Sequence, residues 1–190
     1  MSDFIKVFPD MIPVSTCEAL IEMFDTSGEV TANMIVDEQG TDVADGWRRS
    51  SGVYLSAENC GAHLAIMERA FQTAYGRFVN AYPVLKTQKT ILPERFNLIR
   101  YAGDEEYYDW HLDGTDPGTR FRYVSQVAYL NNVPEGGETE FREQNQLIRP
   151  VQGSILMFPS GWTHEHRGRP PVGSSKYIVT SWLRYPEPEI

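Results

Sequence analysis

The sequence predicts an α+β, mainly β fold, in which a compact antiparallel jelly roll or barrel is supported by helices from the N-terminal part. Apolar residues recur at intervals of three and four in the first 82 residues, which is typical of amphipathic helices. After Pro93 the period changes, and short segments rich in β-branched and aromatic residues alternate with clusters of Gly, Pro, Asn and Asp. The 190 residues suffice for one well-filled core and are few for two.

The N-terminal part predicts one short strand and two helices. Residues 4–8 (FIKVF) alternate between apolar and polar positions, as strand residues do. A first helix is expected over 15–28, opened by a capping box of Ser15 and Glu18. Residues 59–82 place their large apolar side chains on one helical face and predict a second helix.

About eight short strands are expected in the roughly 90 residues that follow. That density of strands is typical of small antiparallel jelly rolls and barrels. The segments are RFNLIRYAG, YYDWHLD, FRYVSQVAYLNN, TEFR, NQLIRP, SILMFPS, WTHEHRG and SKYIVTSWLRY.

The same patterns set the expected domain boundaries. We expect one domain over 1–190, with a jelly-roll core at about 94–185 and helical support at about 13–82. Residues 29–46 are polar and predict a loop, which is either a plain connection or a lid beside a site. The last residues, RYPEPEI, are expected to be loosely held.

Composition and charge argue against several classes of function. The formal net charge of −9 disfavours a nucleic-acid or anionic-membrane partner. The two cysteines, Cys17 and Cys60, are too few for a disulfide framework and suit a reducing compartment. The start lacks the basic and apolar regions of a secretory signal, and no apolar run approaches the ~18 residues of a membrane span. We therefore expect a soluble, cytoplasmic protein.

The histidines suggest a metal site. Residues i and i+2 of an extended segment face the same way, so His111 and Asp113 should point together, as should His164 and His166. If the two segments face each other, two histidines and one carboxylate make a triad that leaves coordination positions open and suits non-haem Fe(II). The alternative is that these histidines are hydrogen-bonded packing residues. The fourth, His63, has no histidine or acidic partner one helical turn away and is expected to be a surface or core residue.

Lys176 suggests a ligand for such a metal. It opens a strand that is otherwise apolar on both faces, and such a strand should lie in the interior of a sheet, where a lysine needs an anion. A five-carbon dicarboxylate could chelate iron through a 2-oxo acid end and reach the ammonium with its far carboxylate. Tyr101 and Tyr129 are candidate hydroxyl donors to the same molecule. The alternative is that Lys176 extends into solvent at the strand end.

Four ordered segments resemble a known family. They are YAGDEEYYDWHLD, VAYLNNVPEGGETEF, RPVQGSILMFPS and HRGRPPVGSSKYIVTSWL. In this order they closely resemble the 2-oxoglutarate/Fe(II)-dependent dioxygenases of the prolyl 4-hydroxylase type, over about residues 96–184. The resemblance implies a double-stranded β-helix, the jelly roll of that family. The glycine pair of GGET would also serve any tight turn, and the first 90 residues and the link DGTDPGTRFR do not match the family pattern.

The resemblance also implies roles for individual residues. The family has Lys or Arg ten residues after its second histidine ligand, and Lys176 lies ten residues after His166, so His166 is the implied ligand and His164 a neighbour. Tyr108 and Trp110 are expected as aromatic walls of the site. No catalytic residue is implied beyond the metal centre. The implied iron ligands are His111, Asp113 and His166, the 2-oxoglutarate-binding residues are Lys176, Tyr101, Tyr129 and Thr139, and the substrate-binding residues are Arg122 and Trp182.

The activity that the resemblance implies is hydroxylation. Such an enzyme takes Fe(II), 2-oxoglutarate and O2, with L-ascorbate as an optional reductant, releases succinate and CO2, and acts on prolyl residues of a peptide or protein. One alternative is hydroxylation of another residue, a free amino acid or another small molecule. A second is a non-oxidative, cupin-like metal-binding protein, and a third is a relative that binds ligands without activity. The lysine and the ordered GGET segment favour the oxygenase.

Overall fold

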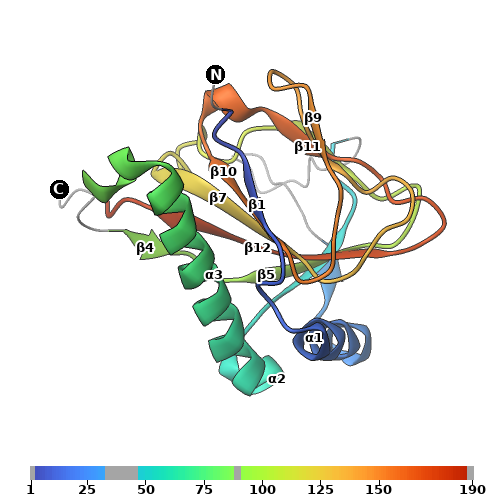
Figure 1. The fold of residues 1–190 in the computed structure, drawn as a ribbon. Coiled ribbons are helices and arrows are strands. Elements are labelled where there is room, and N and C mark those ends of the chain that lie inside the picture. Colours follow the sequence, from blue (N-terminus) through green and yellow to red (C-terminus); the bar gives the residue numbers. More distant parts are fainter. Residues whose placement is uncertain (1–2, 33–46, 88–90, 188–190) are drawn as a thin grey trace.

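Two antiparallel sheets and a layer of helices make up the fold (Figure 1). The computed structural model describes residues 3–32, 47–87 and 91–187. Within these ranges the sheets form the double-stranded β-helix, or jelly roll, and the helices from the N-terminal part pack on the outside of the larger sheet. The predicted fold class, mainly β with helical support, is confirmed.

The larger sheet has eight strands in the order β1-β10-β7-β12-β5-β3-β2, with β4 also paired to β12. Its strands are β1 (Lys6–Phe8), β2 (Thr31–Ala32), β3 (Ser51–Tyr54), β4 (Leu92–Pro93), β5 (Asn97–Tyr101), β7 (Arg122–Tyr129), β10 (Ile155–Pro159) and β12 (Lys176–Arg184). β12 lies at the centre, between β5 and β7, as the prediction of an interior strand requires. The sequence analysis missed β2, β3 and β4; β2 and β4 have only two residues each, which is too short to display a period.

The smaller sheet has four strands in the order β6-β11-β8-β9. They are β6 (Tyr108–His111), β8 (Thr139–Phe141), β9 (Gln146–Ile148) and β11 (His166–Gly168). β6 and β11 are neighbours, although more than fifty residues separate them in the chain, and His166 stands directly opposite His111. Sheet pairing therefore joins the two segments in which the sequence placed metal ligands.

The first helix begins differently from the prediction. The helices are α1 (Val14–Thr26), α2 (Ala57–Cys60) and α3 (Ala62–Ala81), with 3₁₀ turns η1 (Pro83–Thr87) and η2 (Trp162–His164). Pro13 occupies the N-cap of α1 and no side chain caps it, so the predicted capping box of Ser15 and Glu18 is wrong. Ser15 lies inside the first turn because the helix starts one residue earlier. A capping box does exist before α2, where Ser56 and Asn59 bond each other's backbone N–H groups at 3.3 and 2.9 Å.

The predicted helix over 59–82 is interrupted near its start. Gly61 has a φ of +52°, which divides α2 from α3. The predicted apolar face of α3 is confirmed, since Met67, Phe71 and Phe78 are buried against the larger sheet. α3 thus lies along one face of this sheet (Figure 1).

Alternate residues of β7 face two separate cores. Val124 and Ala128 belong to the core that the helices cover, whereas Val127 and Tyr129 belong to the core between the two sheets. This is the period-two alternation of a strand buried on both sides. The space between the sheets and the space beneath α3 are therefore on opposite sides of β7.

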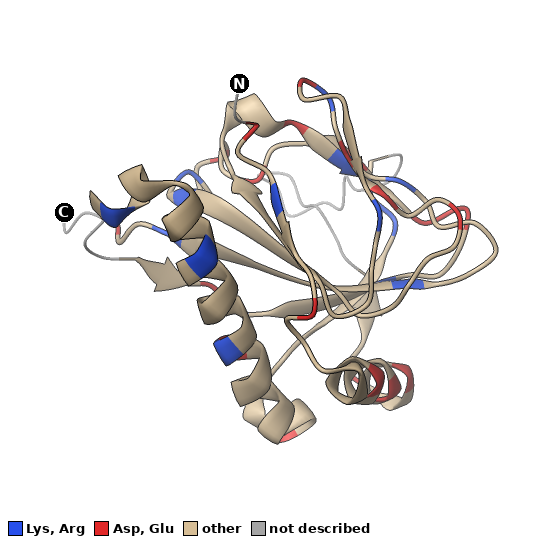
Figure 2. Ribbon diagram, in the orientation of Figure 1, with Lys and Arg blue, Asp and Glu red and all other residues tan. Residues whose placement is uncertain are grey.

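Charged residues are distributed unevenly over the helices (Figure 2). Acidic residues occur along α1, while basic residues are prominent on α3. Both signs occur around the sheets. In the described ranges, no helix combines the length and the apolar character that crossing a membrane requires.

Candidate active site

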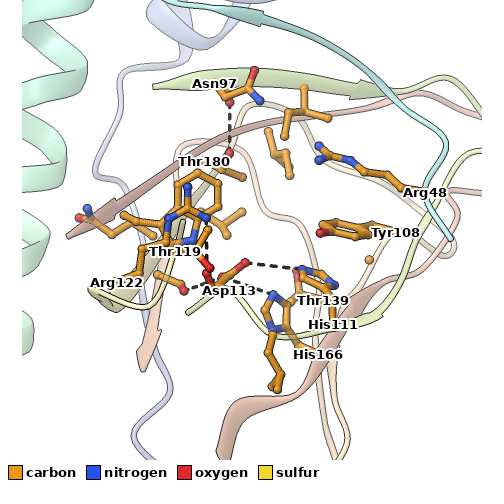
Figure 3. Close-up of a pocket in the computed structure, with 18 of the residues that line it drawn as sticks. Arg48, Asn97, Tyr108, His111, Asp113, Thr119, Arg122, Thr139, His166 and Thr180 are labelled. Atoms are coloured by element: carbon orange, nitrogen blue, oxygen red, sulfur yellow. Dashed lines mark hydrogen bonds and ion pairs between the residues drawn. The ribbon is translucent and has the colours of Figure 1, made fainter. Parts of the chain in front are cut away.

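Three side chains that the sequence predicted as metal ligands lie together inside the jelly roll (Figure 3). His111 ends β6, Asp113 follows two residues later, and His166 begins β11. The Nε2 atoms of His111 and His166 each lie 3.7 Å from a different carboxylate oxygen of Asp113. All three residues are buried, and one ligand atom from each falls within 4.8 Å of the others. This group could hold a metal ion.

Backbone hydrogen bonds determine that Nδ1 carries a hydrogen in both imidazoles. The Nδ1 of His111 lies 2.7 Å from the carbonyl oxygen of Asp109, and the Nδ1 of His166 lies 3.0 Å from that of His164. A carbonyl oxygen only accepts, so each Nδ1 carries the hydrogen and donates it. In a neutral imidazole this arrangement leaves the lone pair on Nε2, the atom that faces Asp113, as in metal-binding histidines. The donor set therefore fits a metal ion.

The charge of the group also suits a divalent cation. Burial alone would raise the pKa of Asp113, but His166, His111 and a 2.6 Å hydrogen bond from the Ser125 hydroxyl outweigh it and hold this pKa below its ordinary value. Burial lowers the pKa of His111 to about 3, so this imidazole stays neutral. One carboxylate with imidazole nitrogens is a ligand set that non-haem iron accepts.

A stack of side chains covers one side of the group. The ring of Tyr108 lies on that of His111, with centroids 3.5 Å apart and planes at 12°. The guanidinium of Arg48 lies 4.6 Å from the centroid of Tyr108 on its other side, and its Nε donates to Ser50 at 3.1 Å. Burial raises the pKa of Tyr108 to about 12, so the phenol keeps its proton. The sequence analysis missed Arg48, which no motif marks.

His111, Asp113 and His166 line a pocket of about 240 Å³. The pocket also contains most of the residues expected to bind 2-oxoglutarate or substrate. Those lining it are Tyr101, Arg122, Thr139, Lys176 and Trp182.

Lys176 is enclosed in this pocket and does not extend to solvent, since it is 1% exposed. Its Nζ lies 5.3 Å from the ring centroid of Tyr101 and 5.9 Å from that of Tyr129. Burial lowers the pKa of Lys176 to about 7. The charge of Glu138 opposes this shift, but that carboxylate also lies 3.9 Å from Arg169. An anion entering the pocket would meet a buried cation for which the described residues provide no close counter-ion.

Tyr129 and Thr139 form one hydrogen-bonded unit near the lysine. Their hydroxyl oxygens are 2.8 Å apart, and both residues are buried. Tyr129 lies behind Thr139, which lines the pocket itself. Tyr101, directly opposite Lys176 in the register of β5 and β12, completes this end of the pocket.

Arg122 and Trp182 form the opposite wall. The guanidinium of Arg122 lies 3.7 Å from the centroid of Trp182 and is held by both carboxylate oxygens of Glu94, at 3.0 and 2.6 Å. The indole of Trp182 also acts on the metal-binding group, because it helps to lower the pKa of Asp113. The sequence analysis missed Glu94, whose pairing with Arg122 depends on the register of β12 with its neighbours and has no local signal.

Two expectations about the surroundings need correction, and a third lies mostly outside the described residues. His164 does not share a strand face with His166, because it lies in the turn η2, where its ring contacts Thr163 and the carbonyl of Asp3. His164 contributes to the site through its backbone carbonyl, which accepts the hydrogen bond from Nδ1 of His166, and not through its ring. Trp110 does not line the pocket, because its ring packs outside against two arginine guanidiniums. Most of the loop expected over 29–46, from residue 33 on, lies outside the described residues.

Comparisons with known proteins agree with this chemistry. Residues 96–184 match the family described as the 2OG-Fe(II) oxygenase superfamily. The chain is 28% identical over 211 aligned residues to a protein of Arabidopsis thaliana named "Probable prolyl 4-hydroxylase 9". That alignment covers 93% of this chain and 67% of the relative.

Solved structures share the fold. A viral collagen prolyl hydroxylase of Paramecium bursaria Chlorella virus-1, in complex with 2-oxoglutarate, has a TM-score of 0.73 at 19% identity, covering 97% of this chain and 98% of that one. A prolyl hydroxylase of Trichoplax adhaerens, in complex with a peptide of hypoxia inducible factor, has a TM-score of 0.76 at 16% identity, covering 96% and 84%. Residues 96–184 thus match the 2OG-Fe(II) oxygenase superfamily, and the chain is similar to the prolyl 4-hydroxylases, which supports a 2-oxoglutarate/Fe(II) oxygenase.

Proposed function

We propose that this chain is a 2-oxoglutarate- and O2-dependent hydroxylase that acts as a prolyl 4-hydroxylase on prolyl residues of a peptide or protein, releasing succinate and CO2. One observation carries the proposal: Lys176 shares a pocket with the group of His111, Asp113 and His166. A metal-binding group at one end and a buried cation at the other match the two ends of 2-oxoglutarate. A metal-binding protein of another kind would not require the lysine.

In this proposal His111, Asp113 and His166 hold Fe(II), and no separate acid or base is needed. Bound Fe(II), with 2-oxoglutarate and O2, supplies the oxidising power to hydroxylate an unactivated C–H bond. The protein positions the three metal ligands, because backbone carbonyls orient both imidazoles and Ser125 orients the carboxylate of Asp113. Tyr108 keeps water away from one face of His111.

The far carboxylate of 2-oxoglutarate is assigned to Lys176. As a point charge, the ammonium accepts a carboxylate without the two-pronged fit that an arginine would impose. The hydroxyls of Tyr101 and Thr139 line the same end of the pocket, and Tyr129 fixes Thr139 through their shared hydrogen bond. Together these groups would replace the water that the carboxylate loses on entering.

The substrate is assigned to the wall formed by Arg122 and Trp182. Both residues line the pocket, and the ion pair with Glu94 holds the guanidinium in place. The names of the relatives support a prolyl residue, and the peptide bound to the Trichoplax enzyme supports a peptide substrate. We further propose that residues 1–190 work as one domain, because α1 and α3 share a core with the larger sheet.

Succinate formation tests the proposal. The protein with Fe(II), 2-oxoglutarate and ascorbate should form succinate, and proline-containing peptides should stimulate it and gain 16 mass units at proline. His166→Gln should abolish turnover, whereas His63→Gln, at a half-buried position of α3 that does not line the pocket, should not. Iron-loaded protein that forms no succinate with any substrate would favour a non-oxidative metal protein. A mass shift on free proline or another residue alone would retain the oxygenase and replace the substrate.

A further inference from the structure

A second cavity, of about 580 Å³, is lined by residues of α3 and of the helix-covered side of the larger sheet. We call it the rear cavity. Its walls are apolar, and their largest contributors are Leu55, Leu64, Phe71, Phe96 and Leu183. This volume is within the range of small-molecule binding sites. β7 separates it from the metal-binding group, so it is a distinct space.

One buried polar side chain in the rear cavity lacks a partner. Gln126 lies between Val124 and Ala128 on β7, and both neighbours face the helix-covered core, so by alternation its side chain points into the rear cavity. Gln126 is 2% exposed, and its Oε1 accepts no hydrogen bond from any described residue. Such orphaned acceptors are uncommon in folded proteins and call for an explanation.

The neighbouring polar groups are already engaged. Ser181, opposite Gln126 in the register of β7 and β12, donates its hydroxyl to the carbonyl of Glu94 at 2.8 Å. The hydroxyl of Tyr75 is 2.6 Å from that of Tyr123. The carboxamide of Gln126 is therefore the polar anchor that this apolar space offers to a ligand.

We propose that the rear cavity binds a small uncharged molecule with an apolar body and a carboxamide head, which pairs with the carboxamide of Gln126. A carboxamide both donates and accepts, so two such groups satisfy each other through a pair of hydrogen bonds. The lining also contains Glu68, Glu94 and Arg95. The carboxylate of Glu94 is paired with Arg122, so the exposed Glu68 and Arg95, of opposite sign, select neither an anion nor a cation. The apolar walls take up the hydrocarbon part. This site is independent of the proposed hydroxylase activity.

Calorimetric titration of the full chain with 3-phenylpropanamide tests the proposal. We expect saturable binding, and at least tenfold weaker binding of 3-phenylpropanoate, whose carboxylate cannot donate to Oε1 and would be buried as a charge. In ¹⁵N spectra, the side-chain amide of Gln126 should shift on titration. Failure of the amide to bind, or binding that leaves the Gln126 signal unmoved, would mean that the rear cavity holds only water or nothing.

Two matched variants sharpen the test. Gln126→Leu keeps a similar volume and removes an unsatisfied buried acceptor, so it should fold, yet it should bind 3-phenylpropanamide about tenfold more weakly. Gln72→Leu, at the exposed rim of the same cavity, should leave the affinity unchanged. Equal affinities in the wild type and Gln126→Leu would overturn the role of the carboxamide.

Discussion

His111 and His166 stand opposite each other in neighbouring strands, and each directs its Nε2 to a different oxygen of Asp113 at 3.7 Å. Because both Nδ1 atoms are tied to backbone carbonyls, the rings cannot rotate without breaking a hydrogen bond. The backbone therefore fixes the orientation of both imidazoles, whereas the position of the carboxylate depends on side chains. Ser125 holds that carboxylate.

Ser125→Ala should weaken metal binding by roughly 10–100-fold, as loss of groups that orient metal ligands commonly does. The hydroxyl of Ser125 donates to Oδ2 of Asp113 at 2.6 Å, and without it one carboxylate oxygen loses its orientation. Ser160→Ala is the matched control, because Ser160 contacts Ser125 at 2.8 Å and the carboxylate only through it. Anaerobic titration with Fe(II) or Mn(II) measures both. Equal affinities in both variants would show that the hydrogen bond to Asp113 is unimportant.

Lys176→Met should stabilise the protein without 2-oxoglutarate by roughly 2 kcal/mol and abolish binding of 2-oxoglutarate. A buried ammonium without a close counter-ion is costly, and methionine fills a similar volume without charge. Urea unfolding and 2-oxoglutarate titration measure the two effects. Lys86→Met, at an exposed position in η1, should change neither. A destabilised Lys176→Met protein that still binds 2-oxoglutarate would show that the lysine is structural.

This stability difference should depend on pH. The pKa of Lys176 is lowered to about 7 in the folded protein, against 10.5 in the unfolded chain, so between these values the unfolded state binds more protons. The wild type should therefore gain stability relative to Lys176→Met as pH rises above 7, by up to about 1.4 kcal/mol per pH unit. Below pH 7 the difference should be constant. A difference that does not change between pH 7.5 and 9.5 would contradict the lowered pKa.

Binding of 2-oxoglutarate should take up a proton near pH 8. The free protein is then largely deprotonated at Lys176, and the incoming carboxylate raises the pKa of this ammonium again. Affinity for 2-oxoglutarate should therefore fall as pH rises above 7, by up to about tenfold per unit. Calorimetry in two buffers of different ionisation enthalpy measures the uptake directly. No uptake at pH 8 would show that the lysine is already charged.

The sequence was a good guide to the site wherever the signal is local. His111 and Asp113 are two residues apart, so strand alternation predicts that they face the same way, whereas His166 was implied by the family resemblance, which has a Lys or Arg ten residues after the second histidine. His164 was misplaced because a 3₁₀ turn replaces the strand that its segment resembles. For the fold, the change in the spacing of apolar residues along the sequence separated helices from strands. This spacing could not reveal strands of two residues, such as β2 and β4.

The residues that the sequence analysis missed depend on contacts between distant segments. Arg48 reaches Tyr108 across sixty positions of the chain, and Glu94 reaches Arg122 across 28. Ser125 can donate its hydrogen bond to Asp113 because β7, which contains Ser125, lies next to that carboxylate in the fold. A pairing register that brings such residues together is set by the whole sheet, so no single stretch of sequence contains it.

Glu94→Gln should raise the KM for a peptide substrate several-fold while leaving the KM for 2-oxoglutarate within twofold. The carboxylate of Glu94 accepts hydrogen bonds from the guanidinium of Arg122 through both of its oxygens and keeps the guanidinium against Trp182. An amide at this position would accept through one oxygen only and would carry no charge to pair with the arginine. Steady-state kinetics with both substrates varied measure this. Glu140→Gln is the matched control, since it breaks a comparable 2.7 Å contact with Arg167 away from the pocket. If both KM values rose together, or the control had the same effect, the arginine–tryptophan wall would not be the substrate site.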